Sequence, residues 1–131
     1  MGRVTYTEQD IKRSTILEPG WYLTEIIDVT EKESSGDRSM NFIIDFKVLS
    51  SRNAEINGVP LRRYFNEKVP NFMKSFIEVF AGKVEVGKTY EITRDLVGKK
   101  LMTNVARGEF NGQPKNEPSD FAPEGVVPAV V

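Results

Sequence analysis

The sequence predicts a mostly β domain, in which five antiparallel strands form a barrel and one helix lies between the third and fourth strands. Three observations lead to this fold class. Five short segments are rich in β-branched and aromatic residues, and turn-forming residues separate them. Between the third and fourth segments, apolar residues recur at spacings of three and four instead of two. The length of 131 residues suits a single domain with one ordinary core.

Near the N-terminal end, an acid, Asp10, follows a threonine, Thr7, by three residues. This arrangement is a capping box and predicts one short turn of helix. We expect residues 1–17 to form a peripheral N-terminal flap that contains this turn. Residues 18–123 then form the barrel domain, and residues 124–131 form a flexible, apolar C-terminal tail.

Residues 21–31 and 40–49 predict the first two strands, which a Ser-Ser-Gly-Asp turn at 34–37 joins into a long hairpin. In the first strand, apolar side chains occur on both faces. We assign Trp21 to the core, and alternation places Val29 on the same face. The second strand alternates strictly, and the face that we expect to be buried consists of Met40, Phe42, Ile44, Phe46 and Val48.

Residues 60–66 predict the third strand, with a proline at the first position, where a strand tolerates it. Leu61 and Phe65 share one face of this strand, and we expect them in the core. Arg62 and Tyr64 therefore point outward.

Apolar rows from Phe72 to Phe80 predict an amphipathic helix that ends at Gly82. Residues 87–92 predict a short strand or a helical turn. The remaining elements are a fourth strand at residues 98–107, a tight Asn-Gly turn at 111–112 and a weaker fifth strand at 115–121.

Three strands, one helix and two strands follow one another in the order of an oligonucleotide-binding (OB) barrel. In such barrels the ligand face is usually formed by the second and third strands and by the loops that join strands one to two and four to five. Other small barrels share much of this order. The predicted fold is therefore a five-stranded antiparallel OB-type barrel with one helix between strands 3 and 4.

The side-chain inventory excludes several classes of active site. The chain has no Cys and no His, so it cannot form disulfides, thiolate zinc sites, a thiol nucleophile or an imidazole base. Residues 98–100 lack the upstream glycine of a phosphate-binding P-loop. We therefore expect a protein without enzyme activity, metal or cofactor. The spacing of the acids neither supports nor excludes a metal nuclease built from carboxylates alone.

No apolar run approaches the ~20 residues that cross a bilayer, and the N-terminal residues have no apolar signal core. The absence of cysteine suits a reducing compartment. We therefore expect a cytoplasmic protein without membrane contact.

The net charge of −1 hides an asymmetry along the chain. Residues 1–58 carry 7 Lys and Arg against 10 Asp and Glu, residues 59–115 carry 11 against 6, and residues 116–131 carry none against 3. The second half can thus supply the basic surface that phosphate binding requires. Mixed charge is equally typical of any soluble surface.

Short motifs occur along almost the whole of residues 18–123. They are Glu-Pro-Gly-Trp-Tyr at 18–22, Asp-Val at 28–29, Ser-Ser-Gly at 34–36, Met-Asn-Phe at 40–42, Ala-Gly at 81–82, Leu-Val-Gly-Lys at 96–99, Glu-Phe-Asn-Gly at 109–112, Asn-Glu at 116–117 and Asp-Phe-Ala-Pro at 120–123. Together they resemble small bacteriophage proteins of the replication and recombination region. The resemblance implies an OB fold, binding of single-stranded DNA, phage replication or recombination proteins as partners, and the cytoplasm of the host cell as location.

The C-terminal tail departs from this resemblance. Single-stranded DNA-binding proteins commonly end in an acidic tail that recruits partners and competes for the DNA groove. Residues 118–131 are instead apolar and rich in proline. The resemblance therefore does not extend to recruitment through the tail, and docking of the tail on another protein or on a second copy of this chain is the alternative.

Binding of a single strand without base readout requires flat aromatic faces for stacking and cations that follow the phosphates. The third strand offers both in Tyr64 and Arg62, and Lys47 points outward beside it on the second strand. An exposed cluster of this kind also arises from cross-strand pairing alone. Further candidates in the two flanking loops and along the fourth strand are Arg38, Phe110, Lys115, Arg107, Lys99 and Lys100. Phe110 fits a plug at the end of the barrel equally well.

Two functions remain open from the sequence. The first is sequence-independent binding of single-stranded DNA, with RNA as the alternative ligand. The second is a non-catalytic protein-interaction module on an OB-like barrel, whose strand edges and apolar tail hold a partner protein or a second copy of the chain. Salt distinguishes them, because binding through phosphates weakens as salt rises and apolar contacts respond much less.

Overall fold

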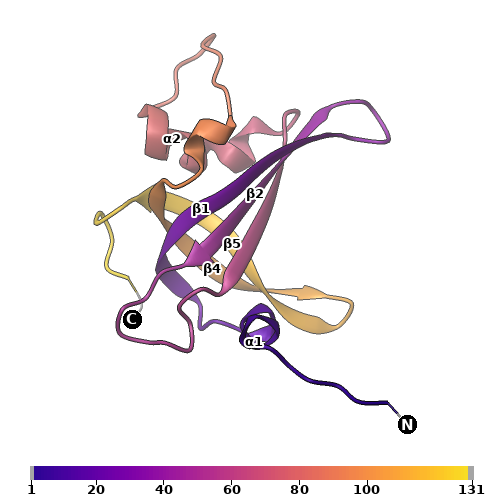
Figure 1. Ribbon diagram of the computed structural model, residues 1–131. Helices are drawn as coiled ribbons and strands as arrows, with labels where there is room; N and C mark the ends of the chain where they lie inside the picture. The colour runs from indigo at the N-terminus through magenta and orange to yellow at the C-terminus, as the bar shows by residue number, and fades with distance from the viewer. Residues whose placement is uncertain (1, 130–131) are drawn as a thin grey trace.

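The computed structural model describes residues 2–129 of the chain (Figure 1). This described part contains two short α-helices, two 3₁₀ turns and five strands, so the prediction of a mostly β protein is confirmed. In chain order the elements are α1 (Glu8–Ser14), β1 (Gly20–Glu33), β2 (Met40–Val48), β3 (Pro60–Asn66), the 3₁₀ turn η1 (Pro70–Met73), α2 (Lys74–Ala81), the 3₁₀ turn η2 (Arg94–Leu96), β4 (Lys100–Phe110) and β5 (Gln113–Pro123).

All five strands belong to one antiparallel sheet with the order β3-β2-β1-β4-β5. β3 and β5 lie at its two edges, and within residues 2–129 no strand pairing joins them, so hydrogen bonds do not close the sheet. The sheet nevertheless curls (Figure 1). The ring centroid of Phe121 on β5 lies 5.7 Å from that of Phe46 on β2 and 6.0 Å from that of Phe65 on β3. The two edge strands thus share one core.

The strict alternation of β2 produces the buried face that the sequence predicts. Ile44, Phe46 and Val48 are fully buried. Met40 and Phe42, nearer the hairpin tip, are half-buried, and Phe42 packs against the core. The core thus lies beneath the C-terminal half of β2.

β1 buries the opposite face at its start from the one predicted. Tyr22 is buried in the core, whereas Trp21 is half-buried and lies outside it, so the assignment of Trp21 to the core is wrong. The Tyr22 hydroxyl donates a hydrogen bond of 2.5 Å to the carbonyl of Glu18, which satisfies its polar end. A β-bulge after Ile26 then shifts the alternation, and Val29 faces the core as well.

The helix predicted between the third and fourth strands is present as α2, and it ends at Gly82, whose φ is 73°. Its Phe76 is fully buried. The ring centroids of Phe46, Phe65 and Phe121 all lie within 6.2 Å of that of Phe76. Four phenylalanines from β2, β3, α2 and β5 therefore form the centre of the core.

Two details around this helix differ from the prediction. Phe72 is exposed instead of lying on the apolar face, because residues 70–73 form a 3₁₀ turn with three residues per turn. Residues 87–92 form neither a strand nor a helical turn, although Ile92 is buried in the core.

The last two strands form a hairpin that is longer than predicted. β4 continues to Phe110, and β5 begins at Gln113. They meet at the predicted turn of Asn111 and Gly112, whose φ values of 52° and 78° are the positive pair that a type I′ turn requires. This hairpin projects beyond the body of the molecule (Figure 1).

The predicted capping box is confirmed at the start of α1. The amide of Asp10 donates to Oγ1 of Thr7 at 3.1 Å, and the amide of Thr7 donates to Oδ2 of Asp10 at 2.9 Å. On the other side of the helix, Lys12 is buried, and its Nζ donates to the carbonyls of Ala54 and Glu55, the latter at 2.7 Å. Lys12 therefore fastens α1 to the loop between β2 and β3.

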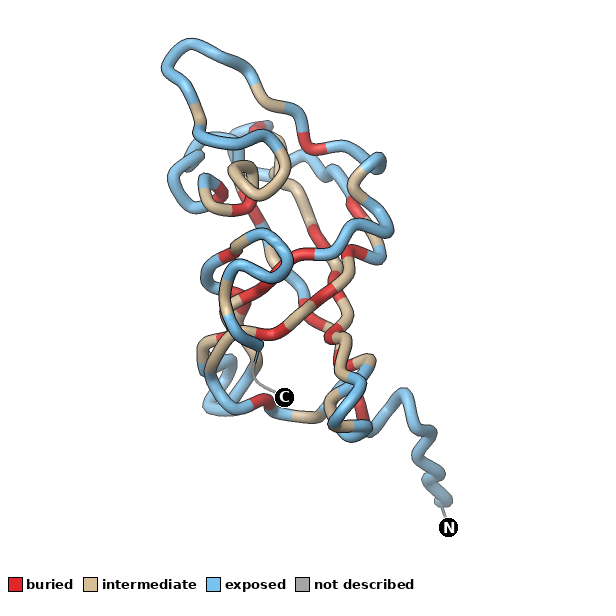
Figure 2. Tube along the Cα trace, turned by 90° about the vertical axis from the view of Figure 1, so that its left-hand side faces the viewer, coloured by how far each residue is buried: buried red, intermediate tan, exposed pale blue. Residues whose placement is uncertain are grey.

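The segment after α1 is also tied to the body. Leu17 is buried in the core. The side-chain amide of Asn116 on β5 accepts from the amide of Leu17 and donates to the carbonyl of Thr15, both at 2.8 Å. Residues 2–6, by contrast, are exposed and extend away from the molecule (Figure 2).

Candidate nucleic-acid interface

A groove with a volume of about 530 Å³ lies between α1, β3 and the start of β5. Ile16 and Leu61 contribute apolar surface to it, and three cations, Arg13, Arg62 and Lys115, also line it. Among the residues that the structure describes, no carboxylate lines this groove. In a chain with a net charge of −1, the groove is therefore a locally positive surface.

β3 presents Tyr64 to this groove. Leu61 and Phe65 are 3% and 1% exposed, which confirms the predicted orientation of the strand. Tyr64 is 58% exposed, and its cross-strand partner on β2 is Ile43. The ring thus offers a flat aromatic face to solvent, as base stacking requires.

The guanidinium of Arg62 is engaged within the protein. Its Nε and Nη2 donate to Oδ1 and Oδ2 of Asp45 at 2.6 and 3.2 Å. These hydrogen bonds from the guanidinium to Asp45 raise the pKa of Arg62 above its usual value. Nη1 of Arg62 lies 3.4 Å from the Tyr64 hydroxyl, and Cζ lies 6.0 Å from the centroid of the Tyr64 ring. Arg62 is therefore a neutralised cation that orients the tyrosine.

The outer face of the sheet beside β3 carries further paired charges. Asp45 on β2 lies opposite Asp28 on β1. Nη1 of Arg94 donates to Oδ1 of Asp28 at 2.6 Å, and this hydrogen bond lowers the pKa of Asp28. Each carboxylate of the cross-strand pair thus has its own arginine, which limits the repulsion between like charges.

The two other cations of the groove come from opposite walls. Lys115 stands on β5, next to the Asn116 that ties down the N-terminal segment. Arg13 follows the buried Lys12 on α1 and is exposed. Arg13 is absent from the candidates that the sequence indicates, because no local pattern shows that α1 packs beside β3.

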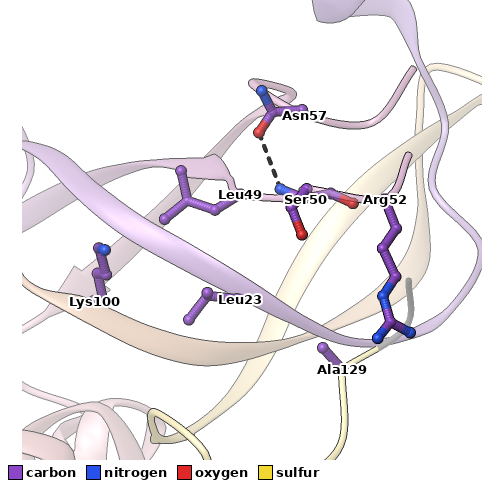
Figure 3. A pocket seen from close by; sticks show the side chains of 8 residues that line it. Leu23, Leu49, Ser50, Arg52, Asn57, Lys100 and Ala129 are labelled. Atoms are coloured by element: carbon purple, nitrogen blue, oxygen red, sulfur yellow. Dashed lines mark hydrogen bonds between the residues drawn. The ribbon is translucent and has the colours of Figure 1, made fainter. Parts of the chain in front are cut away.

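Lys100 lies in a different cavity, of about 540 Å³, on another part of the surface (Figure 3). Its lining includes Leu23 and Leu49, a second cation, Arg52, and Ala129 from the C-terminal tail. This cavity shares no lining residue with the groove that contains Tyr64. The structure therefore separates Lys100 from the candidates on β3.

Arg107 and Lys99 also lie outside the groove. Arg107 lines a small cavity in the half of the β4–β5 hairpin nearer the turn, and its Nη2 donates to the carbonyl of Leu17 at 3.2 Å. Lys99 is exposed, and its carbonyl accepts from the amide of Ile26 at 2.9 Å. Lys47 is half-buried on the outer face, opposite Pro60.

The two hairpin tips carry the remaining candidates. Phe110 is 66% exposed beside the turn of the β4–β5 hairpin, so it does not plug the end of the curled sheet. Arg38 is exposed at the tip of the β1–β2 hairpin, with a φ of 63°, and its Nε lies 3.9 Å from Oε1 of Glu33. Both side chains are accessible to a ligand, but neither lines the groove.

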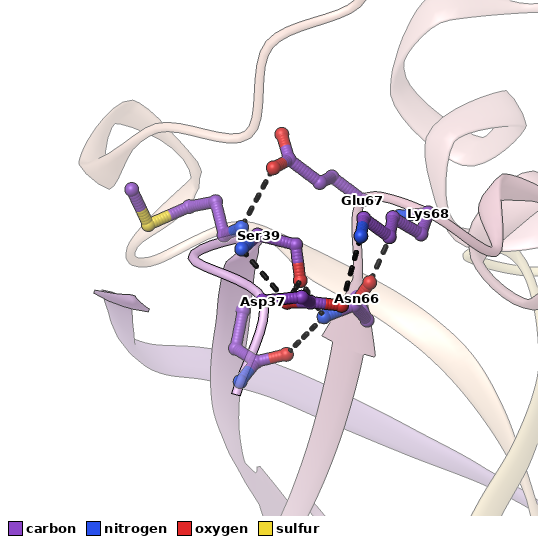
Figure 4. Close-up of polar contacts among 7 residues, drawn as sticks. Asp37, Ser39, Asn66, Glu67 and Lys68 are labelled. Atoms are coloured by element: carbon purple, nitrogen blue, oxygen red, sulfur yellow. Dashed lines mark hydrogen bonds and ion pairs between the residues drawn. The ribbon is translucent and has the colours of Figure 1, made fainter. Parts of the chain in front are cut away.

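A hydrogen-bond network fastens the β1–β2 hairpin tip to the end of β3 (Figure 4). Asp37 accepts from Oγ of Ser39 at 2.6 Å and from Nζ of Lys68 at 2.9 Å. The side-chain amide of Asn66 donates to Oγ of Ser39 at 2.9 Å. The hydrogen bonds from Ser39 and Lys68 hold the pKa of Asp37 well below its usual value. The loop that carries Arg38 is thereby positioned relative to β3.

A scan against models of known protein families gives no match for this chain, and a search of curated proteins gives none either. Within residues 2–129, no helix is long and apolar enough to cross a membrane. The same residues contain no group of three or more acidic side chains close enough to hold a metal ion.

Proposed function

We propose that the protein binds single-stranded nucleic acid, independently of sequence, in the groove between α1, β3 and β5. One observation carries the proposal: the groove combines the exposed ring of Tyr64 with two cations, Arg13 and Lys115, that make no ion pair within the described residues. Stacking of a base on such a ring contributes about 1 to 3 kcal/mol. Arg13 and Lys115 are free of ion pairs within the described residues and are available to phosphates.

The proposal includes an OB-type barrel. The strand order β3-β2-β1-β4-β5, with α2 between β3 and β4, is the order expected of this fold. The shared core of β3 and β5 supports it, although hydrogen bonds do not close the sheet. The resemblance of residues 18–123 to phage single-stranded DNA-binding proteins further suggests single-stranded DNA as the ligand, in phage replication or recombination inside the host cell.

The proposal requires no catalytic step and no cofactor. The sequence has neither His nor Cys, so the commonest proton-transfer and metal-binding side chains are absent. Specific cleavage of labelled DNA with Mg²⁺ or Mn²⁺, tracking with the protein through purification, would overturn this part of the proposal.

Fluorescence anisotropy tests the groove. Labelled oligothymidylate is titrated with the parent and with the Arg13→Gln/Lys115→Gln variant over a series of salt concentrations. Each lost phosphate contact reduces the slope of log K against log[salt] by about 0.7, so we expect the variant to bind more weakly and with a smaller slope. Lys32→Gln and Lys83→Gln together form the matched control, because both side chains are exposed and neither lines the groove. Equal slopes for the two double variants would place the ligand elsewhere.

A protein-interaction module is the second candidate, and a specific observation favours it. Val4 and Tyr6 are 78% and 71% exposed on the extended N-terminal arm, and β3 and β5 each have an unpaired edge to which an extended segment can add. Such a module predicts association of two copies that persists in high salt. Deletion of residues 2–6 then abolishes the dimer in light scattering, whereas under the nucleic-acid proposal the chain binds oligothymidylate with or without this arm.

A further inference from the structure

Two adjacent arginines on β3 differ in how their charge is balanced. Arg62 points outward and makes a bidentate contact with Asp45. Arg63 lies on the inner face between Leu61 and Phe65, and its Cζ stands 5.2 Å from the centroid of the Phe65 ring. No ion pair within the described residues includes Arg63, and its Nε atom is buried without a hydrogen-bond acceptor.

An arrangement of this kind is unusual in a folded protein. Buried polar groups nearly always have a partner, and a desolvated cation without a counter-charge lowers stability. Arg63 is only half-buried, although its two neighbours on the same face are almost fully buried. β2 pairs with one edge of β3, and the other edge, which has no strand partner within the described residues, lies near β5. Arg63 itself is not among the residues that line the groove. Arg63 is thus a half-buried cation without an ion pair, on a strand that borders the seam between β3 and β5.

The outer face of β1, β2 and β3 is a poorer path for phosphates. Asp28 and Asp45 lie opposite one another there, and Arg62 is occupied by the second of them. A phosphate that displaced Arg62 from Asp45 would leave two carboxylates side by side, which is unfavourable. A strand along the seam avoids this conflict, because Arg13 and Lys115 line its groove without ion pairs, and Arg62, which also lines the groove, can stay bound to Asp45.

We infer that Arg63 binds a phosphate group, and that a single strand follows the seam between β3 and β5 instead of crossing the outer face of β2 and β3. The strand passes Arg13 and Lys115, stacks a base on Tyr64 at the edge of β3, and places a phosphate on the Arg63 guanidinium. A planar guanidinium suits a phosphate because it can donate two parallel hydrogen bonds to the oxygens. This inference rests on the proposed function for the source of the phosphate.

The test compares three single variants, Arg63→Gln, Arg62→Gln and Lys83→Gln, in anisotropy titrations with oligothymidylate over a range of salt. Lys83 is an exposed lysine after α2 that does not line the groove, so it controls for the loss of one positive charge. We expect Arg63→Gln to bind several-fold more weakly and to reduce the salt slope by about 0.7. Arg62→Gln should change the slope less than this, because its charge is already neutralised. Lys83→Gln should leave the slope unchanged.

Thermal melts keep a folding defect separate from a binding defect. Removal of an unpartnered cation should leave the melting temperature of Arg63→Gln equal to or above that of the parent. A clearly lower melting temperature, or a slope equal to that of the parent, would overturn the inference while leaving the proposed function intact.

A second experiment distinguishes a phosphate of the nucleic-acid backbone from free inorganic phosphate as the ligand of Arg63. Thermal melts of the parent and of Arg63→Gln are repeated with inorganic phosphate at constant ionic strength. If the parent binds no oligothymidylate, the proposed function fails. A phosphate-dependent rise in melting temperature that Arg63→Gln abolishes then supports free phosphate at this position, and an equal rise in both proteins overturns the site altogether.

Discussion

Nε of Arg62 donates to Oδ1 of Asp45 at 2.6 Å, and this pair lies beside the exposed ring of Tyr64. The pair joins β2 to β3 on the outer face of the sheet, where Asp45 also lies opposite Asp28. The geometry assigns Arg62 a role in holding the surface around Tyr64, while the unpaired cations are available to a ligand.

This relationship predicts a measurable coupling between Arg62 and Asp45. Arg62→Gln leaves Asp45 facing Asp28 without its partner, so it should lower the free energy of unfolding by up to about 1 kcal/mol, as for other solvent-exposed pairs. The Arg62→Gln/Asp45→Asn variant should recover part of this loss. Urea unfolding of the parent, Arg62→Gln, Asp45→Asn and the double variant measures the coupling energy between the two residues. Strict additivity of the two single changes would show that the pair contributes nothing.

Tyr64→Ala should weaken binding of oligothymidylate by about 1 to 3 kcal/mol, because a stacking platform is lost. The salt slope should stay nearly the same, since no phosphate contact is removed. Tyr64→Phe keeps the ring and is the matched control. If Tyr64→Ala binds as the parent does but melts much lower, the residue is structural and the groove is not the site.

Phe46→Ala should damage folding without a specific effect on binding. The side chain is fully buried among the rings of Phe76 and Phe121, so its removal should cost roughly 3 to 5 kcal/mol, much of a small domain's total stability. Urea denaturation measures the loss. A change below about 1 kcal/mol would mean that the aromatic core is not packed as described.

Lys12→Met should loosen α1. The variant leaves the carbonyls of Ala54 and Glu55 without their donor, which should cost about 1 to 3 kcal/mol. Hydrogen exchange of residues 8–17 should accelerate more than that of β2. Arg13→Met, the exposed neighbour on the same helix, removes the same charge and should leave exchange unchanged. Equal effects of the two substitutions would contradict the anchoring role of Lys12.

The lowered pKa of Asp37 predicts that the stability of the fold depends on pH in acid. Its pKa is lowered in the folded state, by hydrogen bonds from Ser39 and Lys68, from an ordinary value of 3.8. Its contribution to stability is therefore fully present above pH 3.8, and it is lost as the pH falls toward the lower pKa of the folded state. Asp37→Asn should lower stability at neutral pH, and the difference from the parent should shrink at about pH 3 and below. A difference that is constant with pH would contradict the network.

Strict local patterns made part of the fold predictable. The alternation of β2, the turn of Asn111 and Gly112, and the capping box of Thr7 each have one physical interpretation, and the structure confirms all three. The prediction for Trp21 is wrong because both faces of β1 carry apolar side chains, so alternation alone does not identify the buried face. The prediction for Phe72 is wrong because helical spacing in the sequence does not distinguish a first α-helical turn from a 3₁₀ turn.

The candidate site was predictable only where it follows from a single strand. The outward direction of Arg62 and Tyr64 comes from alternation, which needs no knowledge of neighbours. The pairing of Arg62 with Asp45 depends on the register of β2 and β3, and the approach of Arg13 depends on how α1 docks. Both are long-range relationships that no local pattern encodes.

Competition between single and double strands tests the central claim most directly. Labelled oligothymidylate bound to the protein is displaced at one fixed salt concentration by unlabelled single strand or by unlabelled duplex of the same length. Because duplex DNA offers no exposed base faces to Tyr64, we predict that the single strand competes at much lower concentration. Equal or stronger competition by the duplex would contradict the proposed function.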